Sequence, residues 1–303
     1  NIKIMKTEFM KLNPIRIVRG IKVFNIKNIK NFTKIYSEII RISNIAFNIK
    51  DARDEYDDHY SYLVAYDDIN DDIVSYYRYI LIDKDNLNNL SNAKYYNFHP
   101  HFINEVLSRS IGLGRSVVNK EAEAEVKDPG GGIFAIWKGG LGPLVYKYQI
   151  IEGEKQYLFG QASLQNQYYE KNITTFDGKN MIIAMVIKNY GDNPSNMVAP
   201  KYDTCIPGRL FSFYLPKFKG DYKEDERTLK VFLKENNIHI PSLLFHYCRL
   251  DPENSGSLRF FLPVYNELLN CTEMALCFDL SQLPETYKRI FIGDPSDINI
   301  DAF

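Results

Sequence analysis

The order in which helical and strand patterns follow one another along the chain predicts an α/β fold. Helical spacing in residues 31–48 is followed by a hairpin pattern in residues 61–82. Strand patterns then begin at residues 111 and 156, each with a helical stretch after it. The chain has 303 residues and 45% hydrophobic content, enough for one large domain or two small ones. A mixed sheet with helices packed on it is the expected architecture.

The first predicted elements are a helix and a hairpin. Apolar residues recur at helical spacing from Phe32 to Ile45, behind Asn31 as a candidate N-cap. The segments SYLVAY and IVSYYRYILI alternate and are rich in β-branched and aromatic residues. The polar stretch DDINDD between them predicts the turn of a hairpin.

Two pairs of a strand and a helix are expected next. IGLGRSVV predicts a strand, and after a polar, glycine-terminated loop the sequence IFAIWKGGLGPLVYKY predicts a helix. Glycines and a proline inside that helix weaken it and leave open a break there. QYLFGQASL then predicts a second strand, and FDGKNMIIAMVIKNYG predicts a helix that ends at Gly191.

A long, Pro-containing stretch without apolar period at residues 192–209 indicates a boundary within the chain. We expect three parts. They are a basic N-terminal arm (residues 1–30), a core (residues 31–200) and a C-terminal subdomain packed on the core (residues 201–303).

Charge is distributed unevenly, although the formal net charge is −1. Residues 1–50 are rich in Lys and Arg, with Glu8 and Glu38 as the acidic residues, and residues 51–85 are strongly acidic. A basic arm could contact a polyanion, either an anionic membrane surface or an acidic carrier protein. The alternative is a solvated surface that the neighbouring acidic segment balances. Basic and aromatic residues do not interleave as in RNA-binding proteins, so no nucleic acid partner is expected.

The cysteines and the apolar runs indicate the compartment. Cys205, Cys248, Cys271 and Cys277 form no C-x-x-C pair, so we expect a reduced, cytoplasmic state and no metal site. No run of about 18 apolar residues is present to span a bilayer. A cytoplasmic protein, with peripheral contact to the inner membrane face as an option, is the expectation.

Three ordered motifs between residues 111 and 167 resemble those of the GNAT superfamily, in the branch that makes lyso-ornithine and related aminolipids. That branch has a strand with Leu-Gly-Arg-Ser, a helix with Leu-Trp-Arg/Lys-Gly and a strand reading Phe-Gly-x-x-Ser-Ile-x-Asn. This chain has Leu113, Gly114, Arg115 and Ser116, then Trp137, Lys138 and Gly139, then Phe159, Gly160, Ser163 and Asn166. The likeness covers residues 50–293, and autoinducer synthases share its first half.

The resemblance implies a GNAT-like fold, with a mixed, mostly antiparallel sheet flanked by helices and a C-terminal extension. It implies transfer of a fatty acyl group from acyl carrier protein or acyl-CoA to the amine of a small amino acid, such as ornithine or glycine. The product would be an aminolipid precursor. The sequence shows no Ser elbow and no Cys with a linked His, so we expect direct transfer, with the thioester as co-substrate and no bound cofactor. The pyrophosphate loop of acetyl-CoA users is missing, which favours acyl carrier protein as donor and partner.

One position departs from the family pattern and keeps two alternatives open. Gly112 stands where the family has an acidic residue that is credited with a charged role in the amine site. A catalytically inactive, lipid-binding relative would fit that loss. A synthase of acyl-homoserine-lactone-like signals would use the same fold with a different amine.

Four charged residues are candidates for the site of the amine substrate. Arg115 could bind a substrate carboxylate or organise the site through a bidentate pair, and the same roles are open for Arg78. The alternative for both is an internal salt bridge to an acidic residue between Asp54 and Asp58. Asp54 and Asp57 resemble residues that grip the amine in autoinducer synthases, and otherwise they belong to a solvated acidic loop.

Backbone amides and one aromatic ring are candidates for holding the thioester. The amides of Gly130, Gly131 and Gly132 could face phosphate at a helix start, and the alternative is a flexible loop without a ligand. Trp137 could wall the acyl tunnel, with core packing as the alternative.

Three polar side chains are candidates for the chemical step. Ser116 could position a proton, and its alternative is an ordinary hydrogen bond within a strand. Ser163 and Asn166 lie on or just after the strand expected beside the thioester, where donors could polarise its carbonyl.

Overall fold

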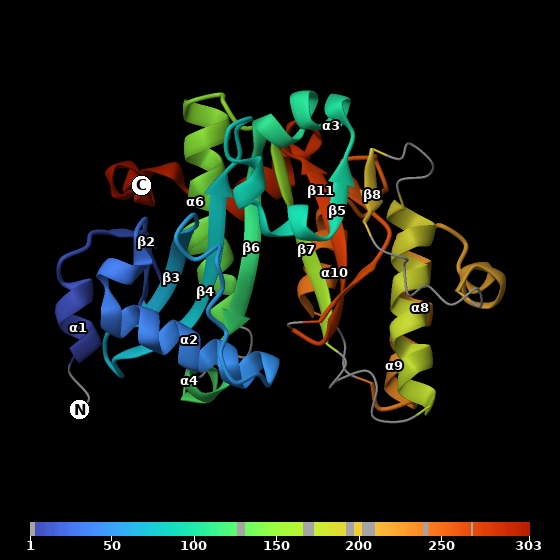
Figure 1. The fold of residues 1–303 in the computed structure, drawn as a ribbon, viewed down its shortest axis with the longest axis horizontal. Coiled ribbons are helices and arrows are strands. Elements are labelled where there is room, and N and C mark those ends of the chain that lie inside the picture. The colour runs from blue at the N-terminus through green and yellow to red at the C-terminus, as the bar shows by residue number, and fades with distance from the viewer. Residues whose placement is uncertain are drawn as a thin grey trace. The chain divides into compact units, whose positions relative to one another are not determined.

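The computed structural model describes residues 4–125, 131–165, 173–191, 197–201, 210–238, 242–267 and 269–303 (Figure 1). Their contacts form two compact units that interleave along the chain. The first unit comprises Asn1–Ile82, Ile111–Gln156 and Pro284–Phe303, and the second comprises Asp83–Ser110 and Tyr157–Leu283. The units cross the boundaries expected at residues 30 and 200, and the three-part division stays a prediction.

An antiparallel sheet runs through the first unit in the order β1, β2, β3, β4, β6. The strands are β1 (Pro14–Val18), β2 (Ile21–Ile26), β3 (Ser61–Asp67), β4 (Asp72–Leu81) and β6 (Ser110–Val118). β1 and β2 come from the stretch expected as a basic arm, and they join the sheet by burying Ile15, Ile21 and Val23. β3 and β4 confirm the predicted hairpin.

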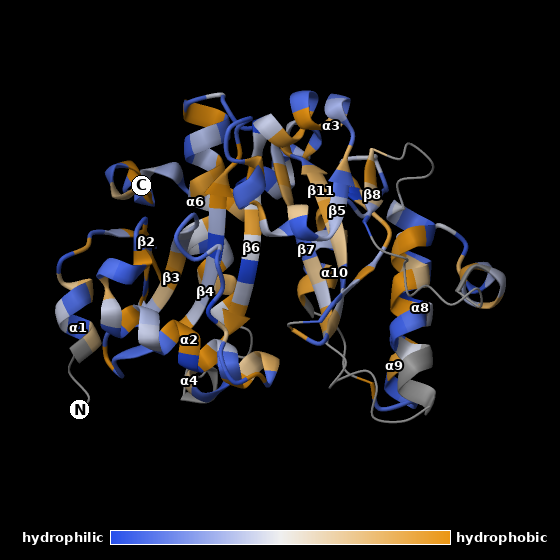
Figure 2. Ribbon diagram, in the orientation of Figure 1, coloured by the Kyte–Doolittle hydropathy of each residue, from blue (hydrophilic) through white to orange (hydrophobic). Residues whose placement is uncertain are grey.

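Helices flank this sheet. They are α1 (Ile4–Phe9), α2 (Thr33–Phe47), α4 (Lys120–Glu125), α5 (Gly131–Ile136), α6 (Gly142–Val145) and α11 (Glu285–Ile292), with π-helical turns η5 (Trp137–Leu141) and η6 (Tyr146–Ile151) and 3-10 turns η1 (Ile29–Asn31), η10 (Pro295–Asp297) and η11 (Ile300–Ala302). α2 confirms the predicted first helix, because it buries Ile35, Ile39 and Ile42 on one side. Hydrophobic and hydrophilic colours accordingly alternate along it in Figure 2. It ends at Asn48, whose φ of 54° is left-handed.

α2 and α5 cover opposite faces of the sheet. Ser75 of β4 donates to the carbonyl oxygen of Gly132 in α5 at 2.7 Å. The hydroxyl of the next residue, Tyr76, lies 2.6 Å from the Ser43 hydroxyl of α2. Successive side chains of a strand point to opposite faces, so these two contacts define the two sides. Both faces of β4 are covered, and its eight inner residues are all buried.

The glycines after Trp137 allow close packing and do not end the helix. The chain stays helical from α5 through η5 and α6 to η6, with π turns where a break was left open. A Cβ on Gly139 would lie 2.4 Å from Val23, and one on Gly142 would lie 2.2 Å from the carbonyl oxygen of Phe291. The helix backbone therefore lies so close to β2 and α11 that a side chain would collide.

Arg16 of β1 ties three segments of the first unit together. It is 7% exposed, and its guanidinium donates to the carbonyl oxygens of Lys138, Ile292 and Asp294. The hydrogen bond to Lys138, in the π turn η5, is 3.0 Å long. Arg16 thus fixes the segment that begins at Pro284 to β1 and to the π turn.

The second unit has its own antiparallel strands. They are β5 (Tyr96–Phe98), β7 (Tyr157–Gln165), β8 (Val198–Pro200), β9 (Leu258–Phe260), β10 (Val264–Asn266) and β11 (Cys271–Asp279). β7 pairs with the whole of β11, with Ser163 directly opposite Glu273. β11 also pairs with β9 and β10, and β5 pairs with β8.

The helices of the second unit are α3 (Pro100–Glu105), α8 (Ile173–Tyr190), α9 (Tyr222–Glu235) and α10 (Ser242–Leu250), with short turns η2 (Leu87–Asn89), η3 (Ser91–Lys94), η4 (Leu107–Arg109), η7 (Leu210–Tyr214), η8 (Leu215–Lys217) and η9 (Leu280–Gln282). Phe159 of β7 meets the rings of Phe98 and Phe102 edge to face. This aromatic contact places α3 against the strand that carries Ser163.

The predicted fold class is confirmed. Both units combine flanking helices with strands that pair antiparallel, and the described residues add a single parallel bridge between Gly191 and Phe260. In the described part of the chain, no helix is both long and apolar enough to cross a membrane.

Candidate functional site

Four of the predicted charged residues meet in a buried cluster of the first unit. Nη1 of Arg78 lies 2.8 Å from Oδ1 of Asp54 and 2.8 Å from Oδ1 of Asp57. Nη2 of Arg115 lies 3.0 Å from Oδ2 of Asp54. The four side chains are between 1% and 11% exposed. We call Asp54, Asp57, Arg78 and Arg115 the ion-pair cluster.

Strand geometry brings both arginines to the same face of the sheet. Tyr77 pairs with Ser116 but Tyr79 pairs with Leu113, so two residues of β6 stand opposite Arg78. Such a bulge re-aims side chains locally. A Cβ on Gly114 would lie 2.7 Å from Cγ of Arg78, so only glycine leaves room for the guanidinium.

Tyrosines complete the hydrogen bonding of the carboxylates. Tyr62, opposite Arg78 in the hairpin, donates to Oδ1 of Asp57, and Tyr36 of α2 donates to Oδ2 at 2.8 Å. The ring of Tyr60 lies 4.9 Å from the guanidinium of Arg78. Sequence reasoning missed these tyrosines, although the alternation in SYLVAY places Tyr62 and Val64 on one face of β3.

The charges of the ion-pair cluster stabilise one another. Burial raises the pKa of Asp54, but the charges of Arg78 and Arg115 outweigh it and hold that pKa below its ordinary value. Burial and the neighbouring Asp57 raise the pKa of Tyr62, so its phenol stays protonated and acts as a donor. The internal salt bridges that were the alternative for Arg78 and Arg115 are therefore present. The roles of these two arginines toward a substrate stay predictions.

The remaining candidates in the first unit take no part in these salt bridges. Ser116 is half-buried on β6, and Trp137 is half-buried with its ring centre 5.5 Å from that of Phe291. Gly131 and Gly132 are buried at the start of α5. A Cβ on Gly132 would lie 2.9 Å from Val118, so packing against the sheet requires a glycine there. Gly130 lies outside the described residues.

In the second unit, Ser163 has a partner that sequence reasoning did not single out. Its hydroxyl donates to Oε1 of Glu273 at 3.1 Å, across the β7–β11 pair. Glu273 is only 3% exposed, whereas Ser163 is exposed. Asn166 lies outside the described residues.

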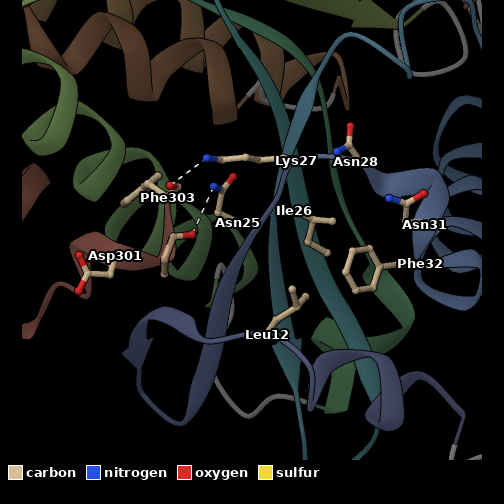
Figure 3. Close-up of a pocket in the computed structure, with 10 residues that line it drawn as sticks. Leu12, Asn25, Ile26, Lys27, Asn28, Asn31, Phe32, Asp301 and Phe303 are labelled. Atoms are coloured by element: carbon tan, nitrogen blue, oxygen red, sulfur yellow. Dashed lines mark hydrogen bonds between the residues drawn. The ribbon is translucent and has the colours of Figure 1, made fainter.

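An open pocket of about 330 Å³ lies elsewhere in the first unit (Figure 3). Its lining includes Asn25, Lys27 and Phe32, and none of the predicted site residues. Lys27 donates to the carbonyl oxygen of Phe303 at 3.0 Å, and Asn25 donates to that of Ala302 at 3.4 Å. The side-chain donors of Lys27 and Asn25 are thus both hydrogen-bonded to carbonyl groups of the chain itself.

Acidic neighbours compensate part of the basic stretch. Lys22 forms a salt bridge with Asp68, and Lys30 forms one with Asp58 at 2.6 Å. This is the balance expected if the basic stretch is an ordinary solvated surface. Among the residues with described positions, no three His, Cys, Asp or Glu side chains gather to hold a metal ion.

The antiparallel α/β fold and the comparisons with known proteins define the class. The model of the acetyltransferase (GNAT) domain matches residues 35–125, which contain all four residues of the ion-pair cluster. Together with the relatives described below, this match supports a GNAT-family N-acyltransferase. Enzymes of this class use acyl-CoA as co-substrate.

Two curated relatives are similar over most of the chain. Both are named glycine N(alpha)-acyltransferase. The protein from Phocaeicola vulgatus is 27% identical in an alignment of length 241 that covers 72% of this chain and 68% of the relative. The protein from Bacteroides thetaiotaomicron is 26% identical in an alignment of length 241 that covers 74% of this chain and 68% of the relative. No solved structure matches the chain.

Proposed function

We propose that this enzyme transfers a fatty acyl group from acyl carrier protein or acyl-CoA to the amine of glycine or another small amino acid. The product is an N-acyl amino acid that serves as an aminolipid precursor. The observation that carries the proposal is the 27% identity, over 241 residues, to a protein named glycine N(alpha)-acyltransferase. Glycine thereby becomes the first acceptor to test, ahead of ornithine.

The proposed reaction is direct transfer. The nitrogen lone pair of the neutral amine attacks the thioester carbonyl, and a C–N bond forms. The C–S bond then breaks and its electron pair leaves with sulfur. The nitrogen loses one proton and the thiolate gains one, so the products are an amide and a thiol. Orientation of the two substrates and stabilisation of the carbonyl oxygen supply the rate enhancement without a covalent enzyme intermediate.

We assign recognition of the acceptor's carboxylate to Arg115. Its Nη1 donates to the carbonyl oxygen of Ala52, and its Nη2 pairs with Asp54. Its Nε is buried and has no hydrogen-bond partner among the residues that the structure describes. An unsatisfied buried donor is costly, and a ligand carboxylate would satisfy it. In this proposal Arg78, Asp54 and Asp57 hold Arg115 in place.

Ser116, Trp137, Gly131 and Gly132 keep the proposed roles of proton positioning, acyl-chain contact and donor binding. Lys11 and Lys34 remain exposed in the basic stretch and suit an acidic carrier protein or an anionic membrane. Comparing kcat/KM for acyl carrier protein and CoA thioesters of one chain length distinguishes the two donors.

The main test is synthesis by purified protein. Thioesters of several chain lengths, on carrier protein and on CoA, are incubated with glycine, ornithine and other small amino acids. Mass spectrometry is expected to find N-acylglycine. If no combination yields an acyl amide, the proposal is wrong.

A second test addresses the carboxylate. Glycine and glycinamide differ in that group, so wild-type enzyme should prefer glycine. Arg115→Lys should lose most of this preference without raising the KM of the thioester. Arg53→Lys is the matched control, because Arg53 is exposed and pairs with Asp51 at the surface.

A further inference from the structure

The helix that begins with α5 in the first unit has an outer face made mostly of apolar side chains. From Gly131 to Gly140 buried pairs of residues alternate with partly exposed pairs, which is the period of a helix lying on a sheet. The partly exposed residues are Ile133, Phe134, Trp137 and Lys138. We call these four residues the outer stripe. The outward side of such a helix is ordinarily polar, so an outer stripe with a single polar side chain calls for an explanation.

Two cations accompany the rings of the outer stripe. The guanidinium carbon of Arg19, an exposed residue in the turn between β1 and β2, lies 4.4 Å from the centre of the Phe134 ring. Nζ of Lys138 lies 5.2 Å from the same centre. Lys138 forms no salt bridge with any residue that the structure describes. The outer stripe therefore combines apolar rings with positive charge.

α11 contacts the outer stripe and brings further side chains of the same two kinds. The ring centre of Phe291 lies 5.5 Å from that of Trp137. The two residues before Phe291 are Arg289, which is exposed, and Ile290, which is 57% exposed. Glu285 is the one acidic residue of α11, and Lys288 of the same helix pairs with it at 2.8 Å. The helix beside the outer stripe therefore adds an exposed aliphatic side chain and a cation.

The surface of an anionic bilayer matches this combination better than a folded partner does. Tryptophan and other aromatic rings favour the level of the lipid head groups, and Lys and Arg beside them bind anionic phosphates. A protein interface carries about one hydrogen bond per 100–200 Å² and so needs neutral polar side chains. The indole N–H of Trp137 is the only such group in the outer stripe. Apolar contact and charge are what this surface offers.

We propose that the outer stripe, together with Arg19, docks the protein on an anionic membrane surface. The rings of Phe134 and Trp137 enter the level of the head groups, and Arg19 and Lys138 bind lipid phosphates. This docking goes beyond the proposed function and depends on neither the donor nor the acceptor. One consequence does rest on the proposed function: a fatty acyl amide made by a docked enzyme is released next to the bilayer that takes it up.

The test uses the fluorescence of Trp137, the only tryptophan of the chain, which reports on the outer stripe alone. The purified chain is titrated with vesicles of phosphatidylcholine, with and without phosphatidylglycerol, at low salt and without substrates. With phosphatidylglycerol present, the emission should shift to shorter wavelength and be quenched by brominated lipid. Added salt should weaken the binding, because it screens the attraction between basic residues and lipid phosphates.

Two variants and a control locate the binding surface by cosedimentation with the same vesicles. Lys138→Glu reverses a charge of the outer stripe and should weaken binding about tenfold or more. Phe134→Ser removes an apolar ring and should weaken it about tenfold, and Lys138→Glu carries the test if this variant does not fold. Lys50→Glu is the matched control, because Lys50 is exposed just after α2, on the opposite face of the sheet from α5. The control should bind like the wild type.

Three results would overturn the proposal. The first is wild-type protein that does not bind the phosphatidylglycerol vesicles, or binds them without a change in Trp137 emission. The second is a folded Lys138→Glu variant that binds like the wild type, or no more weakly than Lys50→Glu. The third is a shift of the emission by acyl carrier protein and not by vesicles, which would make the outer stripe a protein-docking surface. The synthesis test of the proposed function is independent of all three, so the two proposals can fail separately.

Discussion

Replacing Arg78 by methionine is the sharpest test of the ion-pair cluster. Methionine keeps much of the length and all of the apolar contact of the arginine stem, but it removes the guanidinium. Arg78 is 4% exposed and pairs with Asp54 and Asp57 at 2.8 Å each, and Asp57 is 1% exposed. The variant therefore buries two carboxylates that have lost their shared counter-charge.

The loss should be large. Removing one partner of a buried pair costs about 3–5 kcal/mol, because the remaining charge stays desolvated. For a protein of this size that corresponds to a fall in melting temperature of roughly 10 °C. Activity should fall as well, since Arg115 shares Asp54 with Arg78.

The pH dependence identifies the cause. Burial raises the pKa of Asp54 and the charges of Arg78 and Arg115 lower it, with a net shift below the ordinary value of 3.8. A depressed pKa contributes stability above the unfolded value, and this contribution is lost as pH falls through the folded value. Without Arg78 most of this stabilisation is absent. The difference in free energy of unfolding between wild type and variant should therefore be largest at neutral pH. The difference should narrow below about pH 4.

Urea unfolding followed by circular dichroism, at neutral and acidic pH, measures both effects. Arg53→Met is the control, because Arg53 forms a 2.6 Å pair with Asp51, shorter than the pairs of Arg78, but is 64% exposed. It should leave the midpoint unchanged. An Arg78→Met protein as stable as the wild type would refute the reasoning. If the variant loses the same free energy of unfolding at both pH values, lost packing and not lost charge causes the destabilisation.

Two glycine substitutions test the sheet around the ion-pair cluster. Gly114→Ala puts a Cβ 2.7 Å from Arg78 and 2.9 Å from Tyr60, and should cost about 1–3 kcal/mol in urea unfolding, with a parallel loss of acyl transfer; unchanged stability would contradict the close packing. Gly112→Glu introduces the acid that the resemblance leads us to expect but drives a carboxylate against Ile80 and Ile82, so it should lower stability by about 2 kcal/mol or more and bring no gain in kcat. A more active Gly112→Glu enzyme would show that this position can hold the missing base.

Local patterns predicted the elements whose signals are local. The apolar period of α2 and the alternation on both sides of DDINDD were sufficient, because packing follows those periods. The sequence was sufficient to name salt bridges of Arg115 and Arg78 as an alternative to substrate binding, since opposite charges recur in neighbouring segments. It was not sufficient to predict the geometry of these salt bridges, because that geometry depends on the bulge opposite Arg78.

Other features depend on contacts between distant residues. The basic composition around Arg16 hid β1 and β2, and both strands bury neighbouring residues, so they lack the simple alternation that predicts a strand. The glycines of η5 left a helix break open as an alternative, because sequence alone does not show how closely the backbone of Gly139 packs on Val23. Nothing in the sequence singled out Glu273 within its strand, because only the pairing with β7 places it opposite Ser163.

The hydrogen bonds of Arg16 also bear on how the chain folds during synthesis. A ribosome delivers β1 early, yet two of the three carbonyl oxygens that Arg16 binds, those of Ile292 and Asp294, emerge only after the whole second unit has been made. Until then the first unit lacks α11, and apolar surface such as Trp137 lacks its neighbour Phe291. Incomplete domains of this kind tend to aggregate or to recruit chaperones. Truncation before Pro284 should therefore damage the packing of β1 and the π turn, although both are made before that point.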